Sequence, residues 1–315
     1  MAKFAKISMC APKAPLYNGS EDYEALTQQM MNHWQIQLNY VLPNKPDLII
    51  IPEASDRYLG MPMAPRQKYY QHRGDRIRDF FADIALKNNC YIAYSACRNV
   101  PEDEKHPYRN STQIIGRDGN IVGIYDKNHL VPSELDDGGI AYGKEANLIH
   151  LDFADVACAI CFDLNFYELL HKYEVQHPQL IIFSSMYHGG LMQSIWAYRC
   201  RSYFAGAIHN LQSRVLDPFG ETVATSTNYY SYMTTKVNFD YKMAHIDYNE
   251  TKFIAAKRKY GEALTISEPG SIGWVMLTCE DPNMCVDDIV KEFEIELLDD
   301  YMARSLKERH DHLDY

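Results

Sequence analysis

The sequence predicts a mixed α/β (α+β) fold in which helices cover the faces of a sheet. Short apolar runs recur along the 315 residues, and helical stretches lie between them. Continuous apolar runs of this length are typical of strands that are buried on both faces. The alternation of strands, helices and hairpins therefore indicates helices packed on a mixed sheet.

Eight apolar runs are predicted as strands, and two turns between strands carry hairpin signals. Asp118-Gly119 separates two neighbouring runs, and Asp217-Pro218-Phe219-Gly220 marks a second hairpin. The predicted strands are residues 4–9, 48–51, 91–95, 112–117, 121–125, 156–160, 180–184 and 213–217.

Four stretches between these runs are predicted as helices. The second is amphipathic, with five apolar side chains on one stripe: Ile77, Phe80, Phe81, Ile84 and Ala85. The four stretches are residues 20 or 21 to about 40, then 67–88, 164–176 and 192–208.

Composition and charge restrict the class of partner. The chain is 46% hydrophobic and 23% charged, with a formal net charge of −11. A strongly acidic chain is a poor match for nucleic acid or an anionic membrane, because both require a basic surface. No apolar run reaches the roughly 18 residues that span a bilayer, and the N-terminus lacks the apolar core of a signal peptide. We therefore expect a cytoplasmic protein with free thiols.

The chain shows no internal repeat and no linker. We expect one catalytic domain over residues 1–285, followed by a C-terminal helical tail over residues 286–315. The tail alternates charged and apolar residues, so it could pack on its own domain or on a second subunit.

Three of the strand-like runs stop at a reactive side chain. Glu53 follows the run 48–51 and Pro52, Lys127 follows 121–125, and Cys161 follows 156–160. A carboxylate, an ammonium and a thiol at strand ends indicate a site built at the edge of a sheet.

Each of these residues has a possible chemical role. A thiol at a strand-to-helix turn lies near backbone N–H groups and the positive end of a helix dipole, which favour the thiolate of Cys161. A poorly solvated Glu53 would have a raised pKa and could exchange a proton near neutrality. Lys127 could stabilise an oxyanion.

Each residue taken alone also has a structural explanation. Cys161 would be a buried thiol, Glu53 a helix cap or one member of a buried ion pair, and Lys127 a solvated loop residue. Cys158 and Cys161 form an isolated CxxC pair without the further ligands of a zinc site. Core packing is the preferred role of Cys158.

Taken together, the three segments resemble the nitrilase (carbon–nitrogen hydrolase) superfamily over roughly residues 3–240. The family has a Glu–Lys–Cys set in this chain order. The matching motifs are Pro52-Glu53, Tyr125-Asp126-Lys127-Asn128-His129-Leu130 and Cys161-Phe162-Asp163. Phe162-Asp163 looks more like the amidase and carbamoylase branches than the Trp-Glu of true nitrilases.

This resemblance implies a four-layer α-β-β-α sandwich of the nitrilase type. It also implies a cysteine-dependent hydrolase of non-peptide carbon–nitrogen bonds, acting on a small linear amide or an N-carbamoyl compound through a thioester. No metal and no organic cofactor are expected. Family members commonly dimerise, so a homodimer or higher homo-oligomer is expected here.

Further site residues follow from the resemblance and from loop position. Glu134 matches a second glutamate that many members carry near the lysine, and the backbone N–H of Phe162 is expected to help Lys127 hold the oxyanion. The residues expected near the substrate are Arg57, Tyr58, Tyr187 and His188, which follow strand ends.

The segment after the nucleophile departs from the family pattern. Asn165 and Tyr167 stand where many relatives have an arginine and a proline. The usual contact of that arginine with Asp163, and any substrate assignment based on it, are therefore left open. The alternatives are a nitrilase, an acyltransferase, or a catalytically inactive assembly protein with the nitrilase fold.

Overall fold

Two six-stranded β-sheets form the centre of the larger of two units. The computed structural model describes residues 3–313. The larger unit is Lys6–Lys236, and residues 237–313 group with residues 3–5 in a smaller unit. The catalytic domain over residues 1–285 stays a prediction; the division at residue 236 reflects that the described strands after residue 238 pair with one another.

The first sheet combines parallel and antiparallel pairing. Strands β1, β2 and β3 are parallel, and β4 and β5 continue the sheet as antiparallel strands. Its strand order is β12 (Tyr232–Asn238), β1 (Phe4–Cys10), β2 (Leu48–Ile50), β3 (Tyr91–Asn99), β4 (Tyr108–Ile115) and β5 (Ile121–Asp126).

The second sheet has a parallel centre, in which β7 pairs with β8 and β8 with β9. Its strand order is β11 (Thr222–Thr225), β10 (Arg214–Leu216), β9 (Tyr203–Ile208), β8 (Leu180–Ser185), β7 (Asp155–Ile160) and β6 (Ile149–His150). Both predicted hairpins are present, with Gly119 and Gly220 at positive φ in the turns.

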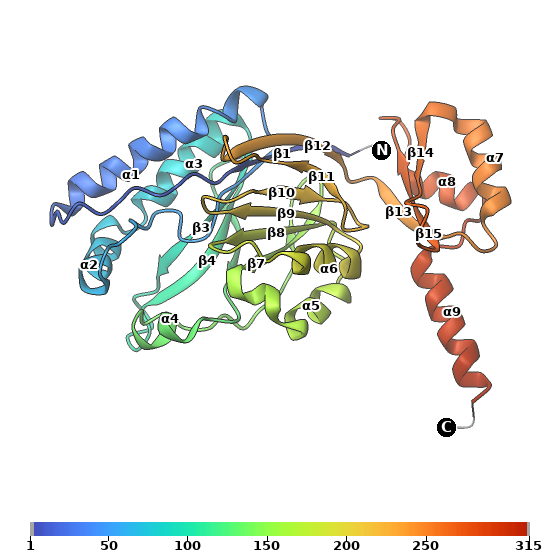
Figure 1. Ribbon diagram of the computed structural model, residues 1–315. Coiled ribbons are helices and arrows are strands. Elements are labelled where there is room, and N and C mark those ends of the chain that lie inside the picture. Colours follow the sequence, from blue (N-terminus) through green and yellow to red (C-terminus); the bar gives the residue numbers. More distant parts are fainter. Residues whose placement is uncertain (1–2, 314–315) are drawn as a thin grey trace. The chain divides into compact units, whose positions relative to one another are not determined.

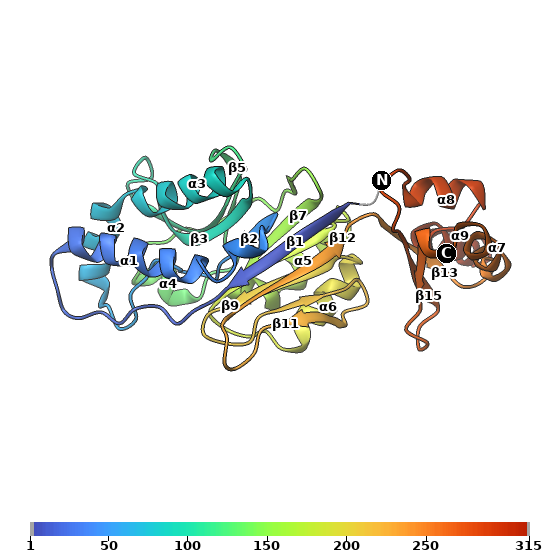
Figure 2. The ribbon, with the colours of Figure 1, turned by 90° about the horizontal axis from the view of Figure 1, so that it is seen from above.

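Helices cover the outer faces of both sheets in the larger unit (Figures 1 and 2). Helices α1 (Tyr23–Leu38) and α3 (Arg76–Asn88) lie over the first sheet, and α5 (Tyr167–Glu174) and α6 (Leu191–Cys200) lie over the second. Two further helices, α2 (Met63–Arg73) and the short α4 (Pro132–Asp136), lie in connecting segments. This arrangement is the predicted four-layer α-β-β-α sandwich.

Two of the predicted helices are wrong in extent. The stretch 67–88 is divided between α2 and α3, because Gly74 adopts a φ of +51° and ends α2. The stretch 192–208 is also divided: Arg201 has a φ of +52°, and the residues after it form β9 beside β8. A short apolar run fits a buried helix or a buried strand equally well, and only the pairing with β8 decides between them.

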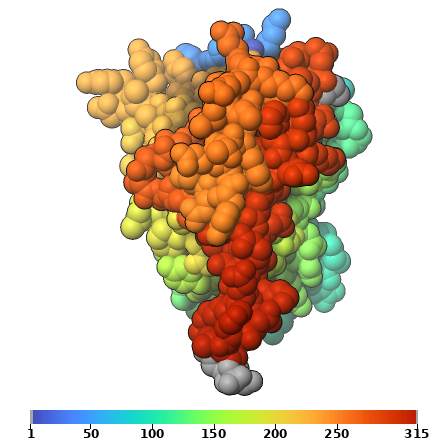
Figure 3. Space-filling model, turned by 90° about the vertical axis from the view of Figure 1, so that its right-hand side faces the viewer, coloured from blue at the N-terminus to red at the C-terminus, as the bar shows by residue number. Residues whose placement is uncertain are grey.

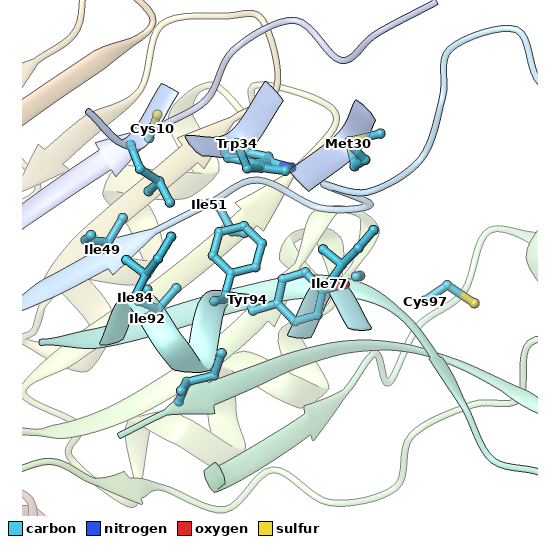
Figure 4. Close-up of a cluster of buried hydrophobic side chains, with 14 of the residues drawn as sticks. Cys10, Met30, Trp34, Ile49, Ile51, Ile77, Ile84, Ile92, Tyr94 and Cys97 are labelled. Carbon is cyan, nitrogen blue, oxygen red and sulfur yellow. The ribbon is translucent and has the colours of Figure 1, made fainter. Parts of the chain in front are cut away.

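An apolar cluster lies between α1, α3 and the first sheet (Figure 4). The Trp34 ring meets Phe81 edge-on, with ring centroids 5.5 Å apart. The indole Nε1–H of Trp34 also donates to the Ser55 carbonyl oxygen at 3.0 Å. Because Ser55 is two residues from Glu53, this contact connects the core of the unit to the loop that carries the carboxylate.

The smaller unit has its own sheet and core. Strands β13 (Tyr241–His245), β15 (Trp274–Cys279) and β14 (Leu264–Ser267) are antiparallel in that order. Its helices are α7 (Glu250–Tyr260), α8 (Val286–Glu292) and α9 (Leu298–Asp311). Apart from the buried Leu298, α9 is largely exposed; it begins beside β13 and extends away from the sheet of the smaller unit (Figures 1 and 3).

Within residues 3–313, no helix has both the length and the apolar character required to cross a membrane.

Replacing Trp34 by alanine should destabilise the larger unit by about 3–5 kcal/mol, because the change removes a large buried ring and leaves a cavity. Urea unfolding followed by circular dichroism would measure the loss. The control is Ile36→Ala on the same helix, where the side chain is exposed and a change within about 0.5 kcal/mol is expected. Equal effects of the two substitutions would contradict the described packing.

Candidate active site

The ends of four strands position the candidate catalytic groups. Glu53 follows β2, Lys127 directly follows β5, Cys161 directly follows β7, and Met186 directly follows β8. The Ser184 hydroxyl at the end of β8 donates to the Ile51 carbonyl oxygen at 2.8 Å and so joins the two sheets at this edge. The site therefore receives groups from both sheets.

Glu53 is buried, with 4% of its surface exposed, and both of its carboxylate oxygens are occupied. Oε1 accepts hydrogen bonds from Lys127 Nζ at 2.9 Å and from Asn110 Nδ2 at 2.8 Å. Oε2 accepts one from the Met186 backbone N–H at 3.1 Å. A residue of β4 and the residues that directly follow β5 and β8 thus hold this carboxylate in one orientation.

The pKa of Glu53 shifts in the direction opposite to the sequence prediction. Burial alone raises this pKa, but the charge of Lys127 and hydrogen bonds from Lys127, Asn110 and Cys161 lower it below the usual glutamate value. Glu53 is therefore a carboxylate in the free protein. A raised pKa was expected because burial can be inferred from the sequence, whereas the neighbouring ammonium cannot.

Cys161 differs from its prediction in the same way. Burial and the negative charge of Glu53 raise the pKa of the Cys161 thiol to about 12, although Lys127 and the Met186 backbone N–H act in the opposite direction. The thiol is consequently protonated at neutral pH, and the predicted thiolate is not the resting form. A protonated thiol beside an ionised carboxylate is an arrangement suited to general-base catalysis.

Lys127 lies between two carboxylates. Its ammonium donates to Glu53, and to Glu134 Oε2 at 2.8 Å. Burial lowers the pKa of Lys127, but the charges of Glu53, Glu134 and Cys161 raise it to a net value above the usual range. The side chain of Lys127 is 1% exposed and remains charged. This burial excludes the alternative explanation of Lys127 as a solvated loop residue.

Glu134 and Asn110 complete this network. Glu134, on α4, accepts from Lys127, from Asn110 Nδ2 at 2.8 Å and from the Val131 backbone N–H at 2.9 Å. Asn110 uses its amide nitrogen to donate to both glutamates, Glu53 and Glu134. It therefore fixes the distance between two carboxylates that would otherwise repel each other.

A close backbone approach supports the position of Lys127. The Gly143 N–H donates to the Lys127 carbonyl oxygen at 2.8 Å. A Cβ atom at residue 143 would lie 2.0 Å from the Asp126 carbonyl oxygen, so only glycine fits at this point.

Cys161 occupies a backbone conformation that is uncommon for a residue with a side chain. Its φ is +48°, at the junction between β7 and the short 3-10 helix Cys161–Asn165. Residues held in this region are found disproportionately at functional sites, where the surrounding structure compensates the strain.

Asp163 provides that compensation. Its buried carboxylate accepts from the Ile160 N–H at 3.0 Å, from the Tyr125 hydroxyl at 2.7 Å and from the His129 N–H at 2.8 Å. The His129 ring also lies 3.0 Å from Asp163 and stacks on Phe166. Asp163 is thus held by Tyr125 and His129, so no arginine at position 165 is required to hold it.

The Glu–Lys–Cys set and the residues that position it line one cavity of about 340 Å³. Five predicted residues line it: Glu53, Lys127, Cys161, Glu134 and Arg57. The other predicted residues lie outside this lining. Tyr58 is buried and donates to the Leu26 carbonyl oxygen at 2.7 Å, and the ring of Tyr187 packs edge-on against Phe183.

The remaining two predicted residues have other contacts. His188 Nδ1 accepts from the Gly190 N–H at 3.2 Å, and the Phe162 ring meets Phe166 edge-on. Phe162 directly follows Cys161 in the 3-10 helix, and its proposed N–H contact with an oxyanion stays a prediction.

Three residues of the site were missed from the sequence. Asn110 lies inside β4, Met186 contributes a backbone N–H, and Arg66 lies on α2. None ends an apolar run in a reactive side chain, which was the pattern used to find the others. An asparagine within a strand that is otherwise buried is the one signal that the sequence offers.

All eight cysteines are free, and Cys158 is buried in β7, consistent with core packing. Among residues 3–313, no group of three or more histidine, cysteine, aspartate or glutamate side chains is arranged to hold a metal ion.

Similarity to characterised sequences agrees with this geometry. An omega-amidase NIT2 from Danio rerio is 22% identical over 218 residues, covering 62% of this chain and 77% of the relative. A protein described as a hydrolase in the agr operon of Staphylococcus lugdunensis is 28% identical over 146 residues, covering 45% of this chain and 60% of the relative.

Solved structures support the fold. The Caenorhabditis elegans NitFhit protein superposes with a TM-score of 0.63 at 15% identity, covering 93% of this chain and 98% of that chain. The Saccharomyces cerevisiae protein Nit3, a member of branch 10 of the nitrilase superfamily, has a TM-score of 0.58 at 17% identity, covering 75% of this chain and 90% of that chain.

The carbon–nitrogen hydrolase family model matches residues 13–231, which is more than half of the chain and includes every residue of the Glu–Lys–Cys set. The chain therefore belongs to the carbon–nitrogen hydrolase family within the nitrilase superfamily.

Proposed function

We propose that the protein is a cysteine-dependent hydrolase that cleaves the carbon–nitrogen bond of a small linear amide or N-carbamoyl compound through a thioester. The observation that carries this proposal is the Glu53–Lys127–Cys161 cluster within one cavity, with an ionised base, a charged ammonium and a protonated thiol. As part of the proposal, the active form is a homodimer or higher homo-oligomer.

The first half of the reaction forms the thioester. Glu53 accepts the proton of the Cys161 thiol as Sγ attacks the carbonyl carbon of the substrate. The negative charge that develops on the carbonyl oxygen is stabilised by Lys127 Nζ and by the Phe162 backbone N–H. Glu53 then returns the proton to the nitrogen, the carbon–nitrogen bond breaks, and ammonia or an amine leaves.

The second half reverses these roles with water. Glu53 accepts a proton from water, whose oxygen attacks the thioester carbon. The tetrahedral intermediate again places its charge at Lys127. Collapse breaks the carbon–sulfur bond, the Glu53 proton returns to Sγ, and a carboxylic acid is released from an amide substrate.

The buried network suits the same Lys127 to both halves of the reaction. Two carboxylates keep its ammonium charged, and its 1% exposure keeps water from screening the charge. Glu134 and Asn110 act as positioning residues, because their contacts are with Lys127 and Glu53 rather than with a reacting atom.

One panel of substrates separates the alternatives. Ammonia and carbon dioxide release would be measured across N-carbamoyl amino acids, N-carbamoyl amines, ω-amides and nitriles. Carbon dioxide release identifies a carbamoyl substrate, and ammonia from ω-amides alone identifies an amidase. Ammonia from nitriles alone contradicts the proposal, and absence of turnover with all four classes favours the inactive assembly protein.

Replacing Cys161 by alanine should reduce hydrolysis by at least about 1,000-fold, because Cys161 is the thiol that is hydrogen-bonded to Glu53. Steady-state ammonia release and the thermal unfolding midpoint would be measured together. Cys158→Ala, three residues earlier in the same segment, removes a buried thiol outside the cavity and should retain activity. Hydrolysis retained in the Cys161 variant would refute the proposed nucleophile.

The pH profile of kcat/KM should be flat from about pH 6 to about pH 9. The pKa of Glu53 lies below the usual glutamate value, so the base is lost only as the pH falls below that range. Lys127 stays protonated because its pKa is raised, and the Cys161 thiol stays protonated over this range because its pKa is raised to about 12. An acidic limb centred near neutrality would mean that the base is not an ionised Glu53.

Replacing Glu134 by glutamine should lower kcat by about 10- to 100-fold with a smaller change in KM, because it removes one of the two charges that orient Lys127. Glu145→Gln, on an exposed loop, is the matched control and should leave both constants unchanged. If both variants kept wild-type kcat, Glu134 would not act on the catalytic lysine.

A further inference from the structure

Two arginines line the same cavity as the catalytic groups. Arg57 lies in the loop that follows Glu53, and Arg66 lies on α2. They come from a segment of the larger unit separate from the strand ends that carry Lys127 and Cys161. The cavity is thus lined by two arginines that the reaction at Cys161 does not use.

Arg66 is incompletely hydrogen-bonded. Its Nη2 donates to the Met61 carbonyl oxygen at 2.6 Å, but its Nε is buried and has no hydrogen-bond partner among the described residues. Burial lowers the pKa of Arg66, Tyr70 opposes that effect, and the nearby positive charge of Arg57 lowers the pKa further. A partly desolvated donor beside a like charge is unfavourable unless an anion compensates it.

Arg57 and Arg66 also lack an ion pair within the part of the chain that the structure describes. Several other buried or partly buried arginines of this unit do have one, for example Arg73, which lies 2.7 Å from Asp56, and Arg98, which lies 2.8 Å from Asp126, whereas Arg214 bonds the neutral acceptors Gln193 and Gly190. The difference indicates that the two cavity arginines are not there to balance a structural carboxylate.

The carboxylates of the cavity do not neutralise these arginines. Glu53 and Glu134 are both hydrogen-bonded to Lys127. Asp137 also lines the cavity but makes no ion pair with either arginine among the described residues. An anion brought by the substrate is therefore the partner that would satisfy both guanidinium groups.

We propose that Arg57 and Arg66 bind an anionic group of the substrate away from its scissile bond, so that the substrate is an ω-amide or N-carbamoyl compound bearing a carboxylate. The planar guanidinium matches a carboxylate through paired N–H donors. A cavity of about 340 Å³ is at the small end for ligand sites, which limits the substrate to a short chain. This inference rests on the proposed hydrolase function.

Matched substrate pairs test the anionic group. Succinamate and glutaramate would be compared with butyramide and pentanamide, and N-carbamoyl-β-alanine with propylurea, so that each pair differs by a carboxylate in place of a methyl group. The wild-type protein should prefer the anionic member by at least about 10-fold in kcat/KM, and this preference should decrease as salt is added.

Arginine variants then assign the preference to these residues. Arg57→Gln and Arg66→Gln should each reduce the anionic-to-neutral ratio of kcat/KM by at least about 10-fold, mainly through the KM of the anionic member. Lys68→Gln is the control, because this exposed lysine lies two residues from Arg66 on the same helix and outside the cavity lining. A ratio unchanged in both arginine variants would overturn the proposal while leaving the hydrolase function intact.

A binding measurement decides the question without turnover. Calorimetric titration of Cys161→Ala protein with glutaramate and with pentanamide should show tighter binding of glutaramate. Introducing Arg57→Gln or Arg66→Gln as a second substitution in this protein should abolish that difference in affinity. Failure of the wild-type protein to hydrolyse any amide would contradict the proposed function, and this titration would still test the arginines. Equal binding of the two amides to the Cys161→Ala protein would overturn the anionic substrate.

Discussion

The buried ion pair between Lys127 and Glu53 is the interaction on which the rest of the site depends. Transferring a carboxylate and an ammonium from water into a protein interior is costly, and their mutual attraction compensates only when the remaining donors and acceptors are also satisfied. Asn110, Glu134 and the Met186 N–H supply those further contacts at 2.8–3.1 Å. The four-layer fold brings these groups together from β2, β4, β5, α4 and the end of β8.

The same ion pair determines the protonation states of the site. Lys127 holds Glu53 as a carboxylate, and burial together with that carboxylate keeps the Cys161 thiol protonated. A preformed thiolate would place two buried negative charges side by side. The proton therefore stays on Cys161 Sγ until a substrate carbonyl is in position. This arrangement favours transfer of the proton to Glu53 as Sγ attacks.

Much of the site could be predicted from the sequence, because strands that end in a reactive residue leave a local pattern. Glu53, Lys127 and Cys161 follow this pattern, Glu134 is implied by the family resemblance, and all four line one cavity. Asn110, Arg66 and Met186 leave no such pattern: the first two contribute side chains from within a strand and a helix, and the third a backbone N–H. Tyr58 shows the opposite error, since it follows a strand end but packs into the core.

The fold, like the site, has features that local sequence patterns predict and features that depend on tertiary contacts. The sequence by itself determined most strands, both hairpins, the amphipathic face of α3 and the chain order of the three reactive residues, because these depend on local periodicity and turn chemistry. Only the tertiary structure decided that residues 203–208 form a strand, that Glu53 is ionised and Cys161 protonated, and that two unpaired arginines line the cavity. Strand pairing and pKa values depend on distances between groups far apart in the sequence, and folding alone sets those distances.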